Sequence, residues 1–141
     1  LFPQAGLWPA DPRARAIARS LSTEMHAGFT ALREHMPMNI RSRFPEERQK
    51  PNVQEDINRI AAIWRRSRER YGVENGGDFL FGSFTILDAM FAPVVSRFRT
   101  YAVDLGEVET SYVEAVWNHP AMQEWTKAAH AEPMVINSAE F

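Results

Sequence analysis

The stretch FTILDAMFAPVVSRFRTY, residues 84–101, decides the fold of this chain. It opens with Thr85-x-x-Asp88, the spacing of a capping box, in which two side chains bind each other's backbone amides at the start of a helix. Aspartate here stands in place of the usual glutamate or glutamine. The spacing indicates a structural cap rather than an acid–base pair. Almost no polar side chain follows before Arg97 and Arg99. A helix that is apolar all round is expected at the centre of a domain, so the stretch predicts a buried central helix.

Helical patterns lie on both sides of this stretch. Asp11 followed by Pro12 is a start signal for a first helix, and Gly72 is a suitable C-terminal cap for a second. The expected helices are 11–35, 53–71, 84–101, 108–117 and 120–131. No stretch shows the period-two alternation of a strand. The sequence therefore predicts an all-α fold, a helical bundle around a central buried helix.

The domain organisation follows from length and from the first residues. The chain has 141 residues, the size of one ordinary domain. Residues 1–10 contain two prolines and a glycine and are expected to form an inter-domain linker, whereas residues 11–141 form the helical domain. The chain does not begin with methionine, and we expect it to be part of a longer protein.

Composition argues against several kinds of function. A net charge of −2 gives no general reason to expect nucleic acid or an anionic membrane as partner, and Glu69 interrupts the basic run WRRSRERY. The absence of cysteine excludes disulfides, thiolate metal sites and a cysteine nucleophile within this chain. The four histidines lack close ligand spacing, so no metal site is expected. No apolar run approaches the ~20 residues of a transmembrane helix, and no membrane partner is expected.

The segment TEMHAGFTALR, residues 23–33, is the part of the first helix that suggests a site. Glycine inside a helix costs about 1 kcal/mol relative to alanine, a cost usually offset by a close approach to the backbone. His26 belongs to a polar row formed by Ser22, Thr23, His26, Thr30 and Arg33. That row faces solvent, or it lines a cleft whose other wall is Met25 and Phe29. Spacing alone favours solvent, and Gly28 is the local feature that favours the cleft.

The chain resembles the C-terminal helical domain of cytosolic glutathione transferases over nearly its whole length. Thr85-Ile86-Leu87-Asp88, with Ala92-Pro93 after it, resembles the family's central-helix motif, close to S/T-I-A-D-x-x-x-A-P. GLWPADPRARA resembles the linker and first-helix start, and HPAMQEW resembles a late region of the domain. TEMHAGF is similar to the T-E-L-H-K-G-F of bacterial, beta-class-like members, with Ala27 at the position of the lysine.

The resemblance implies a two-domain detoxification enzyme, cytoplasmic and homodimeric. A thioredoxin-like N-terminal domain, absent from these residues, would bind glutathione and supply the residue that acts on its thiol. The helical domain would bind the electrophilic small molecule and would need no metal. His26 would lie near the glutathione sulfur as an auxiliary catalytic group, and Met25, Phe29 and Arg33 would contact the substrate. The isolated chain would be inert. Conjugation, peroxide reduction, isomerisation and dehalogenation all agree with this resemblance.

A second interpretation belongs to another class of protein. The same helical fold can serve as a non-catalytic module for protein–protein binding or assembly. The surroundings of His26 separate the two interpretations. A His26 that faces a pocket beside Phe29 favours the enzyme, whereas a solvated His26 on an uninterrupted surface favours the module.

Overall fold

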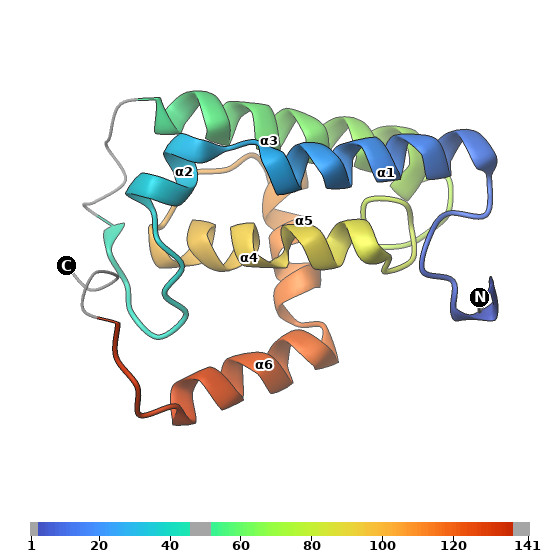
Figure 1. Cartoon of the computed structure of the whole chain (residues 1–141). Helices are drawn as coiled ribbons and strands as arrows, with labels where there is room; N and C mark the ends of the chain where they lie inside the picture. The colour runs from blue at the N-terminus through green and yellow to red at the C-terminus, as the bar shows by residue number, and fades with distance from the viewer. Residues whose placement is uncertain (1–2, 46–51, 137–141) are drawn as a thin grey trace.

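The computed structural model describes residues 3–45 and 52–136, and these form a helical bundle (Figure 1). The helices are α1 (Pro12–Ala27), α2 (Thr30–His35), α3 (Val53–Ser67), α4 (Ile86–Thr100), α5 (Glu107–Trp117) and α6 (Pro120–Ala131). A π-helical turn, Arg68–Gly72, continues α3. Within the described ranges, extended pairing is limited to two isolated bridges between residues 79 and 83. The predicted all-α fold is confirmed. Parts of the expected linker, of the loop before α3 and of the C-terminal tail lie outside the described residues.

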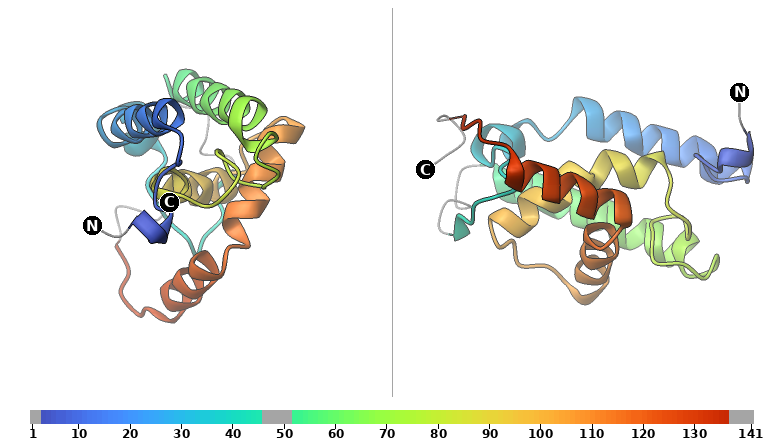
Figure 2. Two further views of the ribbon diagram at one scale, coloured as in Figure 1. Left: turned by 90° about the vertical axis from the view of Figure 1, so that its right-hand side faces the viewer. Right: turned by 90° about the horizontal axis from the view of Figure 1, so that it is seen from below.

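Helix α4 occupies the centre, as the apolar stretch predicts. Seen along the bundle, α1, α3 and α5 surround α4, and α6 lies to one side (Figure 2). The indole ring of Trp64 from α3 is fully buried and packs against three rings. Its centroid lies 5.7 Å from that of Phe91, 5.3 Å from Phe98 and 4.9 Å from Tyr112. These aromatic contacts join α3, α4 and α5 into one core.

The fully buried carboxylate of Asp88 fixes the start of α4. Its Oδ2 accepts hydrogen bonds from the Thr85 amide at 2.8 Å and the Thr85 hydroxyl at 3.0 Å. Its Oδ1 accepts from the Leu80 amide at 3.1 Å and the Tyr112 hydroxyl at 3.2 Å. The capping box is present, and Tyr112 ties α5 to it. Burial raises the pKa of Asp88, and the four hydrogen bonds oppose that rise.

The prediction of one helix over residues 11–35 is wrong, because α1 ends at Ala27 and a separate helix, α2, begins at Thr30. Gly28 is the C-cap of α1, and its amide donates to the Glu24 carbonyl at 2.8 Å. A Cβ atom at Gly28 would lie 2.8 Å from that same carbonyl oxygen. Phe29 follows in the left-handed region, with φ 59°. The glycine therefore serves a helix end, and the cost expected of a glycine within a helix does not arise.

Helix α2 begins without a polar side chain at its own N-cap, which is Phe29. A carboxylate from α3 takes over that task, since the Leu32 amide donates to Asp56 Oδ2 at 2.9 Å. The orphan amides of a helix start need such a partner. The placement of α2 therefore depends on α3.

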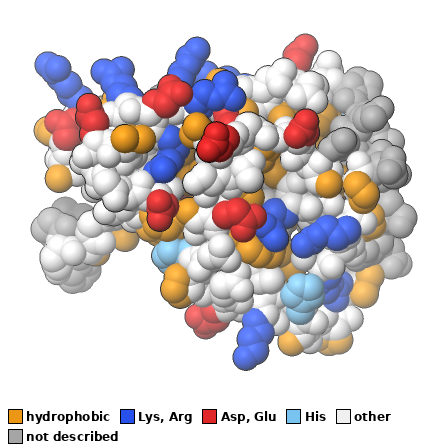
Figure 3. Space-filling view, turned by 180° about the vertical axis from the view of Figure 1, so that it is seen from behind, with side chains coloured by type: hydrophobic (Ala, Val, Ile, Leu, Met, Phe, Trp, Pro, Cys, Tyr) orange, Lys and Arg blue, Asp and Glu red, His pale blue; other side chains and the backbone are white. Residues whose placement is uncertain are grey.

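Two arginines of the basic run at the end of α3 bind other parts of the fold. Arg65 forms an ion pair with the buried Glu109 of α5, and Arg68 donates to the carbonyl of Phe79 at 3.0 Å. On the face seen in Figure 3, basic and acidic side chains are interspersed. These arginines thus hold helices and turns together.

Candidate functional site

His26 lines an open pocket with a volume of about 360 Å³. The pocket lies between α1, the first turns of α4 and the segment that precedes α1. Its lining residues are Trp8, Arg19, Ser22, Thr23, His26, Ile86 and Met90. His26 itself is exposed to solvent. The protein surface is therefore hollowed next to Ser22, Thr23 and His26, and the role of this polar row in binding stays a prediction.

The segment before α1 is held in place by backbone contacts. Arg15 Nη1 donates to the carbonyls of Pro9 at 3.0 Å and Ala10 at 2.9 Å. The amide of Ile86, the first residue of α4, donates to the Leu7 carbonyl at 3.0 Å. These bonds bring Trp8 to the start of α4, where the guanidinium of Arg19 lies 5.5 Å from the ring centroid. A residue of the expected linker thus becomes a wall of the pocket.

The α1 wall carries four polar side chains that share one helix face, those of Arg19, Ser22, Thr23 and His26. The Ser22 hydroxyl donates to the Ala18 carbonyl at 2.9 Å, and the Thr23 hydroxyl donates to the Arg19 carbonyl at 3.0 Å. Both hydroxyl oxygens keep lone pairs for a ligand donor.

The opposite wall is apolar and comes from Ile86 and Met90, which are partly exposed. The surface that lines the pocket is mostly apolar, which suits a small molecule with an apolar body and few polar groups.

Met25 and Phe29 do not line this pocket. They are 5% and 7% exposed and belong to the hydrophobic core. Met25 lies on the α1 face that carries the buried Ala14 and Ala18, and Phe29 follows the break after Ala27. In this pocket the apolar wall comes from Ile86 and Met90 of α4, and the contact of Met25 and Phe29 with a substrate stays a prediction.

Arg33 lies next to the pocket and not in it. Its Nη2 donates to the carbonyls of His26, at 2.8 Å, and of Met25, at the C-terminal end of α1. The part of its guanidinium that makes these bonds holds the helix end. Its contact with a substrate stays a prediction.

Sequence reasoning missed Trp8, Arg19, Ile86 and Met90. Spacing alone could have indicated Arg19, which stands seven residues before His26 on α1. The other three belong to separate segments, and no local pattern connects them with His26.

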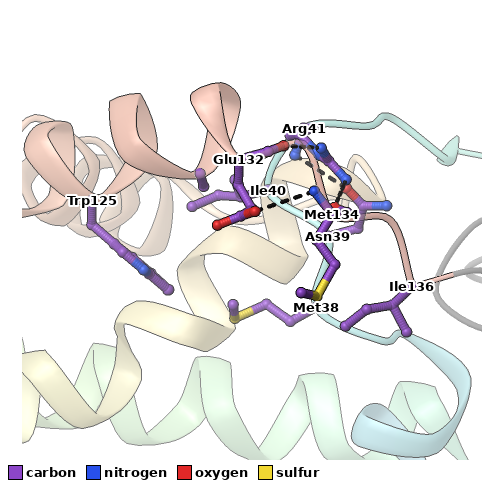
Figure 4. A pocket seen from close by; sticks show the side chains of 9 residues that line it. Met38, Asn39, Ile40, Arg41, Trp125, Glu132, Met134 and Ile136 are labelled. Carbon is purple, nitrogen blue, oxygen red and sulfur yellow. Dashed lines mark hydrogen bonds between the residues drawn. The ribbon is translucent and has the colours of Figure 1, made fainter.

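A second hollow, of about 300 Å³, lies between the segment after α2 and the chain that follows α6 (Figure 4). Arg41 joins its two sides, since Nη1 donates to the Glu132 carbonyl at 2.8 Å and Nη2 to the Met134 carbonyl at 3.0 Å. Trp125 stands at one end and Ile136 at the other, with Met38 between them (Figure 4). The sequence did not mark this hollow.

Within residues 3–45 and 52–136, no group of three or more histidine or carboxylate side chains could hold a metal ion. In the same part of the chain, every helix is too short or too polar to cross a bilayer.

The sequence model of the family described as "Glutathione S-transferase, C-terminal domain" matches residues 15–128. The match runs from the first turn of α1 into α6 and covers most of the chain. The chain therefore belongs to this family, which implies glutathione as the substrate. A comparison with curated proteins finds no matching sequence.

Proposed function

We propose that this domain binds the electrophile in a glutathione transferase whose glutathione-binding, thioredoxin-like domain is joined to it through the linker of residues 1–10. The pocket at His26 is the observation that carries the proposal. It combines hydroxyl and imidazole groups from α1 with the apolar side chains of Ile86 and Met90. An electrophile with an apolar body and polar substituents fits this pair of walls.

The reaction defines what these residues do. The thiolate of glutathione attacks the electrophilic carbon, and the leaving group departs with the bonding electrons. Since the chain has no cysteine, it contributes no thiolate of its own. The residues of this domain hold the electrophile in position, so the electrophile loses less orientational freedom when the transition state forms. His26, exposed on the pocket wall, donates a hydrogen bond to glutathione or to a water beside the sulfur.

The remaining parts of the proposal concern the whole protein. It acts as a cytoplasmic homodimer, and the isolated chain is inert. The isolated chain should therefore show no conjugation of chlorodinitrobenzene above the uncatalysed rate. Activity in highly purified chain would contradict this part of the proposal.

The role of His26 is tested by His26→Ala in the complete protein. We expect kcat/KM for conjugation to fall about tenfold, the equivalent of one lost hydrogen bond of about 1.4 kcal/mol. His130→Ala is the matched control, because His130 is exposed on α6 and lines none of the pockets described above. An unchanged kcat/KM for His26→Ala would remove His26 from the mechanism.

A second candidate function is a non-catalytic module for protein binding. The exposed apolar side chains around the second hollow favour it, since Met134 and Ile136 are 69% and 63% exposed. The intact mass of the native protein, measured together with its activity, separates the candidates. A mass well above 16.1 kDa with conjugating activity supports the enzyme. A mass near that value without activity supports the module.

A further inference from the structure

The pocket at His26 contains one arginine, Arg19, to which the described chain gives no acidic partner. Arg19 stands seven residues before His26 on the same face of α1. The residues three and four positions away from it, within reach on the helix surface, are all without negative charge: Arg15, Ala16, Ser22 and Thr23. The ion pairs within residues 3–45 and 52–136 do not include Arg19. The pocket therefore carries a positive charge that these residues leave unbalanced.

The guanidinium of Arg19 lies over the ring of Trp8, with its central carbon 5.5 Å from the ring centroid. It donates no hydrogen bond within the described residues. A guanidinium that lies over an aromatic ring can still present the N–H groups at its edge to an anion. Arg15, one turn earlier, differs, because its Nη1 donates to the carbonyls of Pro9 and Ala10. Arg15 thus fixes the segment before α1, whereas Arg19 keeps its donors for a ligand.

The two hydroxyl groups between Arg19 and His26 do not replace the guanidinium as donors. The Ser22 hydroxyl donates to the carbonyl of Ala18 at 2.9 Å, and the Thr23 hydroxyl donates to that of Arg19 at 3.0 Å. A hydroxyl has one hydrogen to donate, and here it is already used. The side-chain donors that the α1 wall offers to a ligand are therefore those of Arg19 and His26.

The rest of the pocket accommodates an apolar body. Trp8, Ile86 and Met90 line it, and its surface is mostly apolar. Arg19 and His26 are seven residues apart, which separates their Cα atoms by about 10 Å along the helix axis. A ligand whose reacting carbon lies near His26 therefore meets Arg19 with its opposite end. The pocket matches a molecule with an apolar middle and one anionic end.

We propose that Arg19 binds a carboxylate at the far end of the electrophile, whose apolar body lies on Ile86 and Met90. Guanidinium groups bind carboxylates through parallel hydrogen bonds, which select both charge and orientation. Glutathione also carries carboxylates, but it is polar along its whole length, and the surface of this pocket is mostly apolar. The electrophile in this statement rests on the proposed function. The binding of a carboxylate does not, and it can be measured on this chain directly.

The binding test compares 4-phenylbutanoate with 4-phenylbutanamide, which have nearly the same shape and differ in charge. We expect this chain to bind the acid about tenfold more tightly in a calorimetric titration, and Arg19→Gln to abolish the difference. Arg13→Gln is the matched control and should keep the difference. Arg13 is exposed on the same helix and lines neither hollow. Binding of the acid no tighter than that of the amide, or a difference that persists in Arg19→Gln, would overturn the subsite.

The position of the apolar body is tested by Met90→Ala. This variant should weaken the binding of both compounds by a similar factor of about three, because it removes apolar surface and no charge. Met38→Ala is the matched control, since Met38 is a partly exposed methionine of the second hollow, and it should leave both affinities unchanged. A loss of affinity in Met38→Ala but not in Met90→Ala would place the ligand in the second hollow and overturn the proposal.

Activity separates this proposal from the proposed function. In the complete protein, the thiolate of glutathione would displace chloride from the benzylic carbon of 4-(chloromethyl)benzoate or 4-(chloromethyl)benzamide, and chloride would leave with the bonding electrons. The ratio of kcat/KM for the acid to that for the amide should fall about tenfold in Arg19→Gln, with the KM for glutathione unchanged.

The other outcomes identify which proposal fails. A raised KM for glutathione with an unchanged ratio would mean that Arg19 binds a carboxylate of glutathione, which overturns the assignment to the electrophile. If neither compound is conjugated but 4-phenylbutanoate still binds through Arg19, the transferase proposal fails and the carboxylate subsite stands. If conjugation proceeds without any preference for the acid, the subsite fails and the transferase proposal stands.

Discussion

Two polar clusters on α4 differ in how their hydrogen-bonding groups are used. At the N-terminal end, Asp88 is fully buried, and both carboxylate oxygens accept two hydrogen bonds each. Toward the other end, Arg97 is partly exposed and keeps a guanidinium nitrogen without a protein partner among the described residues. A cluster closed by the protein itself stabilises the fold, whereas an open cluster has donors left for a ligand.

The largest expected effect comes from breaking the closed cluster with Asp88→Ala. The change leaves the Leu80 amide, the Thr85 amide and the Tyr112 hydroxyl without their acceptor. Buried donors without acceptors cost about 1–3 kcal/mol each, so the free energy of unfolding should fall by at least about 3 kcal/mol. Urea unfolding measures this loss. Asp78→Ala is the control, because Asp78 is exposed and should matter little. A loss below about 1 kcal/mol would show that the cluster is not closed as described.

A smaller effect is expected from Asp56→Ala, which tests the support of the open cluster. Asp56 caps α2, and the carbonyl of Met36 at the end of α2 accepts a hydrogen bond from Arg97. Loss of the cap should lower the free energy of unfolding by about 1 kcal/mol. Glu55→Ala is the matched control, since Glu55 also lies in the first turn of α3 but binds no amide of α2. Equal losses in both variants would mean that Asp56 acts only on its own helix.

The smallest expected effect is a pH dependence that belongs to the closed cluster. Because the folded pKa of Asp88 lies above its ordinary value of 3.8, the folded chain binds this proton more tightly than the unfolded chain does. The contribution of Asp88 to the free energy of unfolding therefore falls as pH rises from 3.8 through the folded pKa, and is constant above it.

Asp88→Asn cannot titrate and isolates this contribution. The free energy of unfolding of the wild type minus that of the variant should decrease as pH rises through the same interval. Urea unfolding at a series of pH values measures the difference. A difference that increases with pH would mean that the hydrogen bonds outweigh burial and lower the pKa of Asp88.

The sequence predicted the elements whose signals are local. The cap of α4 needs only Thr85 and Asp88, three residues apart, and the start of α1 needs only Asp11, whose Oδ2 accepts from the Ala14 amide at 2.7 Å. Both could be recognised because the partners lie within one helical turn. The polar face shared by Ser22, Thr23 and His26 could be recognised for the same reason.

Gly28 is a local signal for the end of α1, but its neighbours do not decide whether the helix continues through it. The stripe of apolar residues continues through Gly28 into α2, and no proline interrupts it. The chain turns there because Asp56 caps α2 from 24 residues away and because Phe29 is buried in the core. The pattern of residues around a helix start cannot predict a capping side chain that comes from another helix.

The sequence by itself therefore determined the all-α class, the central buried helix and the caps, because helices and their caps depend on bonds between residues a few positions apart. Only the tertiary structure decided where α1 ends and which wall faces His26. It also decided that Arg97 of α4 binds the carbonyl of Met36 at the end of α2. These features depend on packing between segments that are distant in sequence. Burial of apolar surface is non-directional, so the sequence near an apolar residue does not indicate which segment will pack against it.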